Sequence, residues 1–239
     1  MKIFKKNIRL SVSFIVAIAL TLCIIAIGIY YFSYADTSKH IPALLSSLIA
    51  GLFVALIQFL ISWYDFRANE KVLSLGINKI LVNRDDRKFY ENYITNSSIH
   101  IEMMGVTGSR FLDDFADTDT TATENSKVLL RALERGVKVK ILLPKEDFLM
   151  SQDEKTNASK SYPKFKTLIT KYDSLQVRFF KHIPTHSIFN VDNECIIGPV
   201  FPEVPSKNTP AIYLKNYSQM AKPYITYFEK EWENAEQVY

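Results

Sequence analysis

The residues best suited to chemistry lie in one short stretch, THSIFNVDNECIIGP, at positions 185–199. His186 and Asp192 stand at the two ends of an apolar alternation, which a polar corner and a second apolar run follow. Because side chains alternate between the faces of a strand, one face carries His186, Ile188, Asn190 and Asp192. A histidine held in a strand can act as a catalytic nucleophile. The stretch is therefore either a catalytic strand or an ordinary hairpin that contains a histidine.

A second candidate site is the segment VTGSR at positions 106–110, which joins a predicted strand to a predicted helix. Backbone N–H groups at the start of a helix favour an anion, and Arg110 adds a positive charge beside them. The pattern predicts that Ser109 and Arg110 contact a phosphate. An ordinary turn, with Ser109 as the helix cap, is the alternative.

The remaining histidines and acidic residues do not form the pattern of a metal site. His182 and His186 are four positions apart, but a proline between them prevents a shared helix face. No cysteine or carboxylate cluster completes a ligand set near them. The acidic run from Asp113 to Asp119 lacks the dense oxygen spacing and the glycine turn of a calcium loop. We therefore expect no metal and no cofactor.

From residue 97 onward, the sequence alternates between strand and helix patterns. The expected strands are 98–106, 137–144, 175–182, 185–191, 195–200 and 208–216. The expected helices are 107–117, 124–136, 162–174 and 218–237, and the polar segment 148–163 is expected to be a loop. The aromatic residues of the last helix share a face that favours docking on a sheet, namely Tyr224, Tyr227, Phe228 and Trp232. The sequence thus predicts an α/β/α sandwich with a mixed sheet.

Two uncharged apolar runs precede this domain, at positions 10–32 and 41–64. Each exceeds the length of about 20 residues that a helix needs to cross a bilayer, so we expect a transmembrane hairpin. Basic residues lie before the first run, whereas the loop between the runs carries one lysine and one aspartate. The positive-inside rule then predicts a multi-pass protein of the inner (plasma) membrane with both ends in the cytoplasm. A cleaved secretory signal is the alternative, and it would leave the C-terminal part on the same side.

The second apolar run carries a stripe of small residues, Ser47, Gly51 and Ala55, and one strongly polar residue, Gln58. Small residues let helices approach closely, so the stripe predicts packing within the hairpin or between copies. Gln58 could hydrogen-bond across a helix interface or line a pore. A helical spacing resumes after the run and predicts stalk helices. The expected organisation is a basic cytoplasmic tail (1–9), a transmembrane hairpin (10–66), stalk or linker helices (67–96) and a cytoplasmic domain (97–239).

The order of patterns in the last part resembles one half of a phospholipase D superfamily domain. The resemblance covers roughly residues 97–239 and rests on LLRALERGVKVKILLP, LQVRFFKH, HSIFNVDNECIIGP and the closing aromatic helix. The motif of that family is a histidine, one residue, a lysine, four residues and an aspartate, followed by an apolar strand and Gly-Ser. Family members combine two such motifs, from two halves of a chain or from two chains. The resemblance implies that one histidine attacks phosphorus, the other protonates the leaving group, and the lysines hold the phosphate charge.

This sequence departs from the family motif at most of its chemical positions. His186 matches the histidine, but Ile188 occupies the lysine position and Asn193 occupies the aspartate position. Pro199 stands where the serine of the family would follow Gly198. The loss of a charge-stabilising group commonly lowers a rate on the order of a hundredfold or more. Only one motif is present, so a site built from two motifs would need a homodimer or a higher homo-oligomer.

The first hypothesis is a membrane-anchored, catalytically inactive phospholipase D-like domain. It would act as a ligand-binding sensor or a membrane effector in signalling, for example in stress or phage defence. Its ligand would be a nucleotide or another phosphate-containing molecule, and the bilayer and further copies of the chain would be its partners. The formal charge of +4 sits largely before the first apolar run, so nucleic acid is not expected as a partner. The candidate ligand-binding residues are Ser109, Arg110, Lys140, His186, Asn190 and Asp192.

The second hypothesis is a dimeric phosphodiesterase with a remodelled site. Two copies would bring their His186 side chains together, and His186 would be the catalytic residue. Lys140 or Lys215, from neighbouring strands, would replace the lysine of the motif. The assay that separates the two hypotheses is hydrolysis of phosphodiesters that depends on His186.

Overall fold

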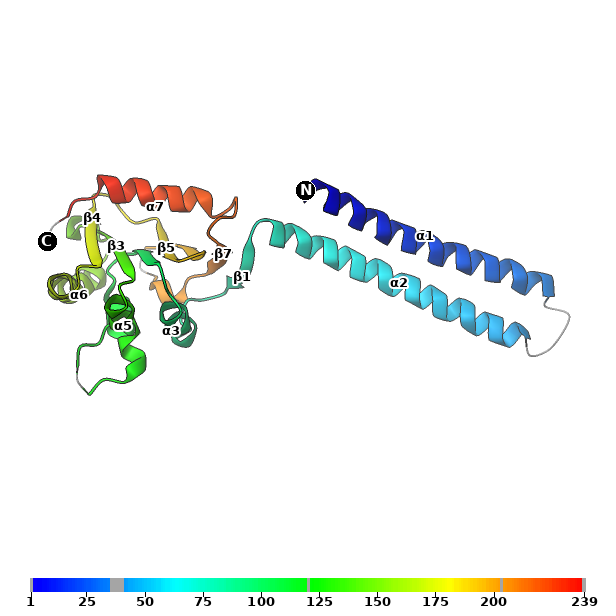
Figure 1. Ribbon diagram of the computed structural model, residues 1–239, viewed down its shortest axis with the longest axis horizontal. Coiled ribbons are helices and arrows are strands. Elements are labelled where there is room, and N and C mark those ends of the chain that lie inside the picture. Colours follow the sequence, from blue (N-terminus) through cyan, green and yellow to red (C-terminus); the bar gives the residue numbers. More distant parts are fainter. Residues whose placement is uncertain (1, 35–40, 120, 203, 238–239) are drawn as a thin grey trace. The chain divides into compact units, whose positions relative to one another are not determined.

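The computed structural model describes residues 2–34, 41–119, 121–202 and 204–237. The chain divides into two compact units, Met1–Val72 and Leu73–Tyr239 (Figure 1). The first unit is helical, and the second contains the sheet.

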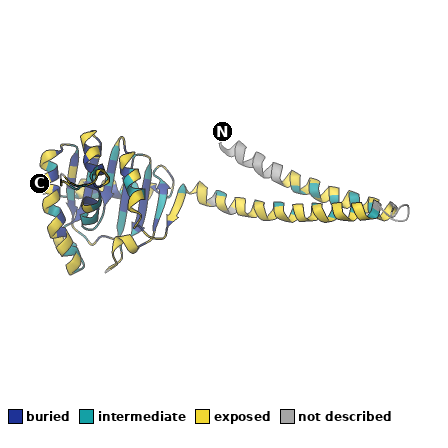
Figure 2. Cartoon of the chain, turned by 90° about the horizontal axis from the view of Figure 1, so that it is seen from below, coloured by how far each residue is buried: buried dark blue, intermediate teal, exposed yellow. Residues whose placement is uncertain are grey.

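The first unit contains α1 (Lys2–Tyr34) and all but the last two residues of α2 (Ile41–Ser74). The segments Phe14–Ser33 and Pro42–Ser74 each have a mean hydropathy of 2.5, and none of their most apolar window is buried. Figure 2 shows the residues of these helices whose burial is described largely in the colour of exposed residues. By length and composition, these helices could cross a membrane. The loop 35–40, on which the expected orientation partly depends, lies outside the described residues.

The predicted small-residue stripe lies outside the partly shielded face of α2. The shielded positions recur every three or four residues, as in a helix seam, and include Leu45, Ile49, Leu52, Leu56 and Phe59. Ser47, Gly51, Ala55 and Gln58 are all exposed. Within the described part of this unit, the stripe therefore does not form the shielded seam.

The second unit is built on a mixed seven-stranded sheet with the order β1-β7-β6-β5-β2-β3-β4. Strands β2, β3 and β4 are parallel, and all other neighbours are antiparallel. The strands are β1 (Ile77–Leu81), β2 (His100–Met104), β3 (Lys138–Pro144), β4 (Leu175–Phe180), β5 (His186–Val191), β6 (Glu194–Pro199) and β7 (Ala211–Lys215). This arrangement confirms the predicted α/β fold class with a mixed sheet.

Helices cover both faces of the sheet (Figure 1). One face packs against α3 (Arg87–Thr95), α4 (Ser109–Phe115), α5 (Val128–Glu134) and α6 (Gln152–Lys171), with Phe111, Leu129 and Phe165 in the main core cluster. The other face packs against α7 (Lys222–Asn234), whose Phe228 and Trp232 join Met104, Leu142 and Ile188 in a second cluster. Short 3₁₀ helices lie at Glu124–Lys127, Glu146–Phe148 and Ser206–Asn208. The aromatic face predicted for the last helix therefore docks on the sheet, as expected.

The prediction of a loop over 148–163 is wrong for most of that segment. Helix α6 begins at Gln152, because Ser151 and Glu154 form a reciprocal capping box. The Ser151 side chain accepts the backbone N–H of Glu154, while the Glu154 carboxylate accepts the backbone N–H of Ser151 at 3.3 Å. Pro163 lies inside the helix. The polar composition of this segment indicated a loop, although the sequence contains the capping-box residues Ser151 and Glu154, which signal the start of a helix.

The prediction of helices throughout 67–96 is wrong for one segment. Helix α2 continues to Ser74, and α3 supplies the later helix. Between them, Gly76 has a positive φ of +78° and Ile77–Leu81 forms β1, which pairs with β7. A side chain at position 76 would overlap the Ser218 Cβ at 2.2 Å, so a glycine is required for this close approach. The apolar residues Ile77, Ile80 and Leu81 have a helical spacing, but the segment is the edge strand of the sheet because it pairs with β7.

Candidate functional site

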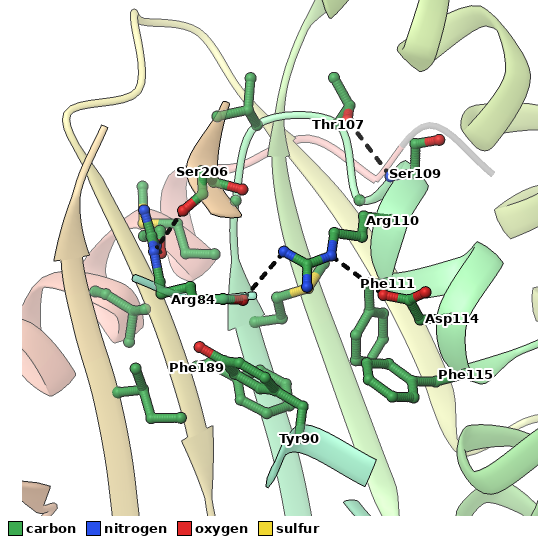
Figure 3. A pocket seen from close by; sticks show the side chains of 18 residues that line it. Arg84, Tyr90, Thr107, Ser109, Arg110, Phe111, Asp114, Phe115, Phe189 and Ser206 are labelled. Carbon is green, nitrogen blue, oxygen red and sulfur yellow. Dashed lines mark hydrogen bonds and ion pairs between the residues drawn. The ribbon is translucent and has the colours of Figure 1, made fainter. Parts of the chain in front are cut away.

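A pocket of about 180 Å³ lies beyond the C-terminal end of β2. Its walls come from the turn 105–108, from the start of α4, from β5 and β6, and from the segment that follows β1 (Figure 3). Ligands of open α/β sheets bind in crevices outside the carboxyl ends of the strands. The position of this pocket therefore makes it the main candidate site.

The turn between β2 and α4 is shaped by Gly108. Gly108 is the N-cap of α4 with a φ of +64°, and a Cβ there would lie 2.8 Å from the Phe165 ring. Ser109 is therefore the first residue of the helix and not its cap, which corrects the expected capped turn. The Ser109 hydroxyl donates to Asp113 Oδ2 at 3.2 Å, and its backbone N–H contacts Thr107 Oγ1 at 3.4 Å.

Arg110 lies at the rim of the pocket, where its guanidinium is held by three acceptors. Nε donates to Asp114 Oδ2 at 3.2 Å, and Nη1 donates to the backbone oxygen of Arg84 at 3.0 Å. Nη2 forms an ion pair with Asp85 Oδ1 at 3.1 Å. These contacts tie the start of α4 to the segment after β1.

Arg84 is the main residue of the pocket that the sequence did not reveal. Its side chain is buried, with only 6% of the residue exposed. Nε donates to the Ser206 backbone oxygen at 2.9 Å and Nη2 donates to that of Pro199 at 3.1 Å. Nη1 donates to the Ser187 hydroxyl, and Nη2 also donates to the hydroxyl of Thr209. In the described part of the chain, no acceptor of this guanidinium carries a charge.

The electrostatic environment of Arg84 is consistent with an uncompensated charge. Burial is the main cause that lowers the pKa of Arg84, and the nearby charge of Arg110 lowers it further, against an opposing effect of Tyr90. A buried cation is costly unless it is paired with an opposite charge. The charge of Arg84 therefore favours an anion in its vicinity.

Gly198, in the IIGP run, makes room for Arg84. A Cβ at this position would lie 2.8 Å from the Pro210 backbone oxygen and 3.1 Å from Cζ of Arg84. A glycine inside a strand can mark a close approach of another group to the backbone, and Gly198 is such a position. Arg84 itself lies in the polar run NRDDR, which is typical of a solvated surface segment.

The structure places His186 away from the residues that line this pocket. His186 lies at the start of β5, half-buried, and its Nδ1 is 2.8 Å from Thr185 Oγ1. Its ring packs against the rings of Tyr224 and Tyr227 on α7, with centroid distances of 5.5 and 6.0 Å. The histidine therefore contacts the helix that covers the other face of the sheet.

Ile188 is part of the hydrophobic core beneath α7. Only 1% of the residue is exposed, and it clusters with Met104, Leu142 and Phe228. The position of the family lysine is thus enclosed by apolar side chains.

Asn190 and Lys140 meet through Glu102, a residue that the sequence analysis did not select. Asn190 Nδ2 donates to Glu102 Oε2 at 2.9 Å and lies 3.1 Å from His100 Nε2. Lys140 Nζ pairs with Glu102 Oε1 at 3.2 Å. Asn190 is 2% exposed. These side chains form a polar network on the sheet and do not line the pocket.

Asp192 lies at the opposite end of β5 from His186, where it anchors the start of β2. Its φ is +50°, and its carboxylate accepts the backbone N–H groups of Ser98, Ile99 and His100, each at 2.9 Å. Burial would raise the pKa of this carboxyl, but the hydrogen bonds from His100, Ser98 and Ile99 outweigh it and lower the pKa. The structure thus brings Ser109 and Arg110 together at the pocket, and places the other four predicted residues elsewhere.

No group of three or more histidine, cysteine or acidic residues within the described ranges is arranged to hold a metal ion. The two cysteines, Cys23 and Cys195, are free thiols. Burial raises the pKa of the Cys195 thiol to about 12, so this thiol is not an activated nucleophile.

No protein-family model matches this chain, and no curated protein matches it. Among solved structures, TrmBL2, an archaeal chromatin protein with a novel mode of DNA binding, is 13% identical with a TM-score of 0.46, covering 82% of this chain and 71% of that protein. A phosphatidylserine synthase from Haemophilus influenzae Rd KW20 is 11% identical with a TM-score of 0.41, covering 66% of this chain. This chain spans 39% of the length of that synthase. Neither likeness assigns a function.

The fold and the pocket together define a class of protein. It is an α/β protein with a mixed seven-stranded sheet, preceded by two apolar helices that could span a membrane.

Proposed function

We propose that this chain is a membrane-anchored ligand-binding protein whose sheet domain does not hydrolyse phosphodiesters. In this proposal, the domain binds a phosphate-containing ligand and acts as a sensor or effector at the membrane. The observation that carries it is the environment of Ile188, which is 1% exposed within the core beneath α7. A lysine of the phospholipase D type would have its ammonium group buried there among Met104, Leu142 and Phe228.

The surroundings of His186 support the same conclusion. Its ring packs on Tyr224 and Tyr227, and Nδ1 is engaged with the Thr185 hydroxyl. Phosphoryl transfer depends on fixed positive charge around the phosphate. Lys140 and Lys215, the two candidate lysines from neighbouring strands, do not supply this positive charge, because Lys140 is paired with Glu102 and Lys215 is paired with Glu194.

A binding role is supported by the pocket at the end of β2. Arg84 and Arg110 bring two guanidinium groups to its wall, and guanidinium groups favour phosphate and carboxylate. The connection between the pocket and the apolar helices is short. The segment that carries Arg84 directly follows β1, and β1 follows α2 after Leu75 and Gly76. In this proposal, occupation of the pocket acts on the segment that contains Arg84, which is joined through β1 to α2.

The orientation of the protein is part of the proposal. The basic N-terminal tail predicts that both ends of the chain lie in the cytoplasm, in an inner (plasma) membrane. Self-association into a homodimer or larger homo-oligomer also stays a prediction, and mass measurement of the full chain in nanodiscs would test it.

The test of the proposed function is a phosphodiesterase assay on the full chain, purified in detergent, with bis(p-nitrophenyl) phosphate as substrate. We expect no release of nitrophenol above the blank from either the wild type or His186→Ala. Hydrolysis by the wild type that disappears in His186→Ala would overturn the proposal. That outcome would support the dimeric phosphodiesterase.

A further inference from the structure

We propose that the pocket at the end of β2 takes a phosphate monoester that carries an aromatic or short aliphatic group. The phosphate would lie at Arg84 and Arg110, and the apolar group would lie against Met103, Phe111 and Phe189. This inference rests on the proposed function and names the chemistry of its ligand.

The first step is the balance of charge at the wall of the pocket. Arg110 is neutralised by Asp114 and Asp85, and Asp114 also lies 4.0 Å from Arg87 Nε. Arg84 has only neutral hydroxyl and carbonyl acceptors among the described residues. The wall therefore carries an excess positive charge, and an anion would offset it in a partly dehydrated setting where such pairs are strong.

The second step is the character of the remaining wall. Figure 3 shows the Arg110 guanidinium above the rings of Tyr90, Phe111 and Phe189, and the Arg84 guanidinium farther to the left, turned toward Ser206. Met103 also lines this part. A free inorganic anion would leave these apolar side chains in contact with water. A ligand that joins an anionic group to an apolar group would contact both the guanidinium groups and the apolar side chains. The burial of apolar surface adds about 25 cal/mol per Å² to the favourable free energy of binding.

The surroundings of the pocket limit the length of the anionic part of the ligand. A second cavity of about 470 Å³ shares Thr107, Ser109 and Arg110 with the pocket. It is lined by the acidic residues Asp113, Asp153 and Glu154 and by the basic residues Arg110 and Lys207, so that acidic residues outnumber basic ones. A chain of several phosphates that extended in this direction would meet like charge, which is unfavourable. The arrangement favours a single phosphate over a di- or triphosphate.

Such a monoester could come from solution or from a membrane lipid, and the experiment separates these sources. The full chain is placed in nanodiscs of phosphatidylcholine, and binding of phenyl phosphate, inorganic phosphate and phenol is measured by calorimetry. A second set of nanodiscs contains phosphatidic acid, and the melting temperature of the protein is compared between the two sets. We expect phenyl phosphate to bind at least about tenfold more tightly than inorganic phosphate, and phenol not to bind. Stabilisation in phosphatidic acid nanodiscs without phenyl phosphate binding would assign the same chemistry to a lipid.

Substitutions locate the site. Arg84→Gln should weaken binding of the active probe about tenfold or more, because it removes charge-assisted hydrogen bonds. Arg131→Gln is the matched control, because Arg131 is exposed on α5, pairs with Glu124 and does not line the pocket. Because Arg84 also holds the loop around Ser206, Arg110→Gln and Phe111→Leu serve as second variants if Arg84→Gln does not fold.

Two results would overturn the inference. One is the absence of binding by both phenyl phosphate and phosphatidic acid. The other is binding that is equal in the wild type, Arg110→Gln and Phe111→Leu. Neither result bears on hydrolysis, so the proposed lack of phosphodiesterase activity is judged separately by the His186 assay.

Discussion

Replacement of Gly198 by alanine tests the packing that holds Arg84 in the pocket wall. The added Cβ would lie 2.8 Å from the Pro210 backbone oxygen and 3.1 Å from Cζ of Arg84. One neighbour is backbone and the other is a buried guanidinium with four hydrogen-bond contacts, so neither can move without loss. Overpacking of this kind costs about 1–3 kcal/mol.

The loss of hydrogen bonds adds to this cost. If Arg84 moves, the backbone oxygens of Ser206 and Pro199 lose a donor, and each lost hydrogen bond costs about 1 kcal/mol. We therefore expect Gly198→Ala to lower the free energy of unfolding by about 3–5 kcal/mol. At about 2–4 °C per kcal/mol, the melting temperature of the sheet domain should fall by about 6–20 °C.

The assay is urea unfolding of the detergent-purified full chain, followed by near-UV circular dichroism, which responds to the aromatic core of the sheet domain. Gly105→Ala is the matched control, because a Cβ at Gly105 meets no atom within 4 Å and the turn there has no positive φ. Gly105→Ala should change the free energy of unfolding by less than about 0.5 kcal/mol. Equal stability of the two variants would refute the claim that Gly198 makes room for Arg84.

Three further predictions follow from other parts of the sheet domain. Ser151→Ala should lower the free energy of unfolding by about 1 kcal/mol through loss of the capping box of α6, and urea unfolding beside the exposed control Ser159→Ala measures it. Ile188→Lys should lower the free energy of unfolding of the domain by about 3 kcal/mol or more, because the ammonium group would be buried. The variant should show no phosphodiesterase activity. A stable, active variant would contradict the assignment of Ile188 to the core. Asp192 has a lowered pKa in the folded state, so it stabilises the protein above the unfolded pKa of about 3.9, and this contribution is lost as the pH falls through the lower folded value. The difference in stability between the wild type and Asp192→Asn should therefore narrow below about pH 4, and a difference that stays constant from pH 7 to pH 3 would refute the capping role.

Most elements of the fold could be predicted because their signals are local. The helix that ends before Gly136, the strand Lys138–Pro144 and the hairpin at Asp192 each carry their own apolar period and turn residue. The prediction was wrong for two elements, for different reasons. The first turns of α6 are polar and were recognisable only by the capping box of Ser151 and Glu154. Strand β1 depends on pairing with β7, a partner far along the chain.

The candidate site was harder to predict than the fold, because the guanidinium of Arg84 is held by residues that are distant in the sequence. The junction at Ser109 and Arg110 was found from its local pattern, and it borders the pocket. Arg84 could not be selected in the same way. Its acceptors lie on Ser187, Pro199, Ser206 and Thr209, more than a hundred positions later. A buried arginine is distinguished from a surface arginine by these contacts and not by its neighbours in sequence.

In the hairpin from His186 to Gly198, the two faces make different contacts. The face that carries the motif positions, with His186 and Ile188, packs under α7. The alternate face presents Ser187 to Arg84 and Phe189 to the pocket, and Gly198 gives the guanidinium its space. Because the side chains of a strand alternate between its two faces, the residues on these faces cannot change places without a shift of register. In the proposed binding site, this hairpin therefore contributes Ser187 and Phe189, with Gly198 beside Arg84, on the face opposite to its histidine.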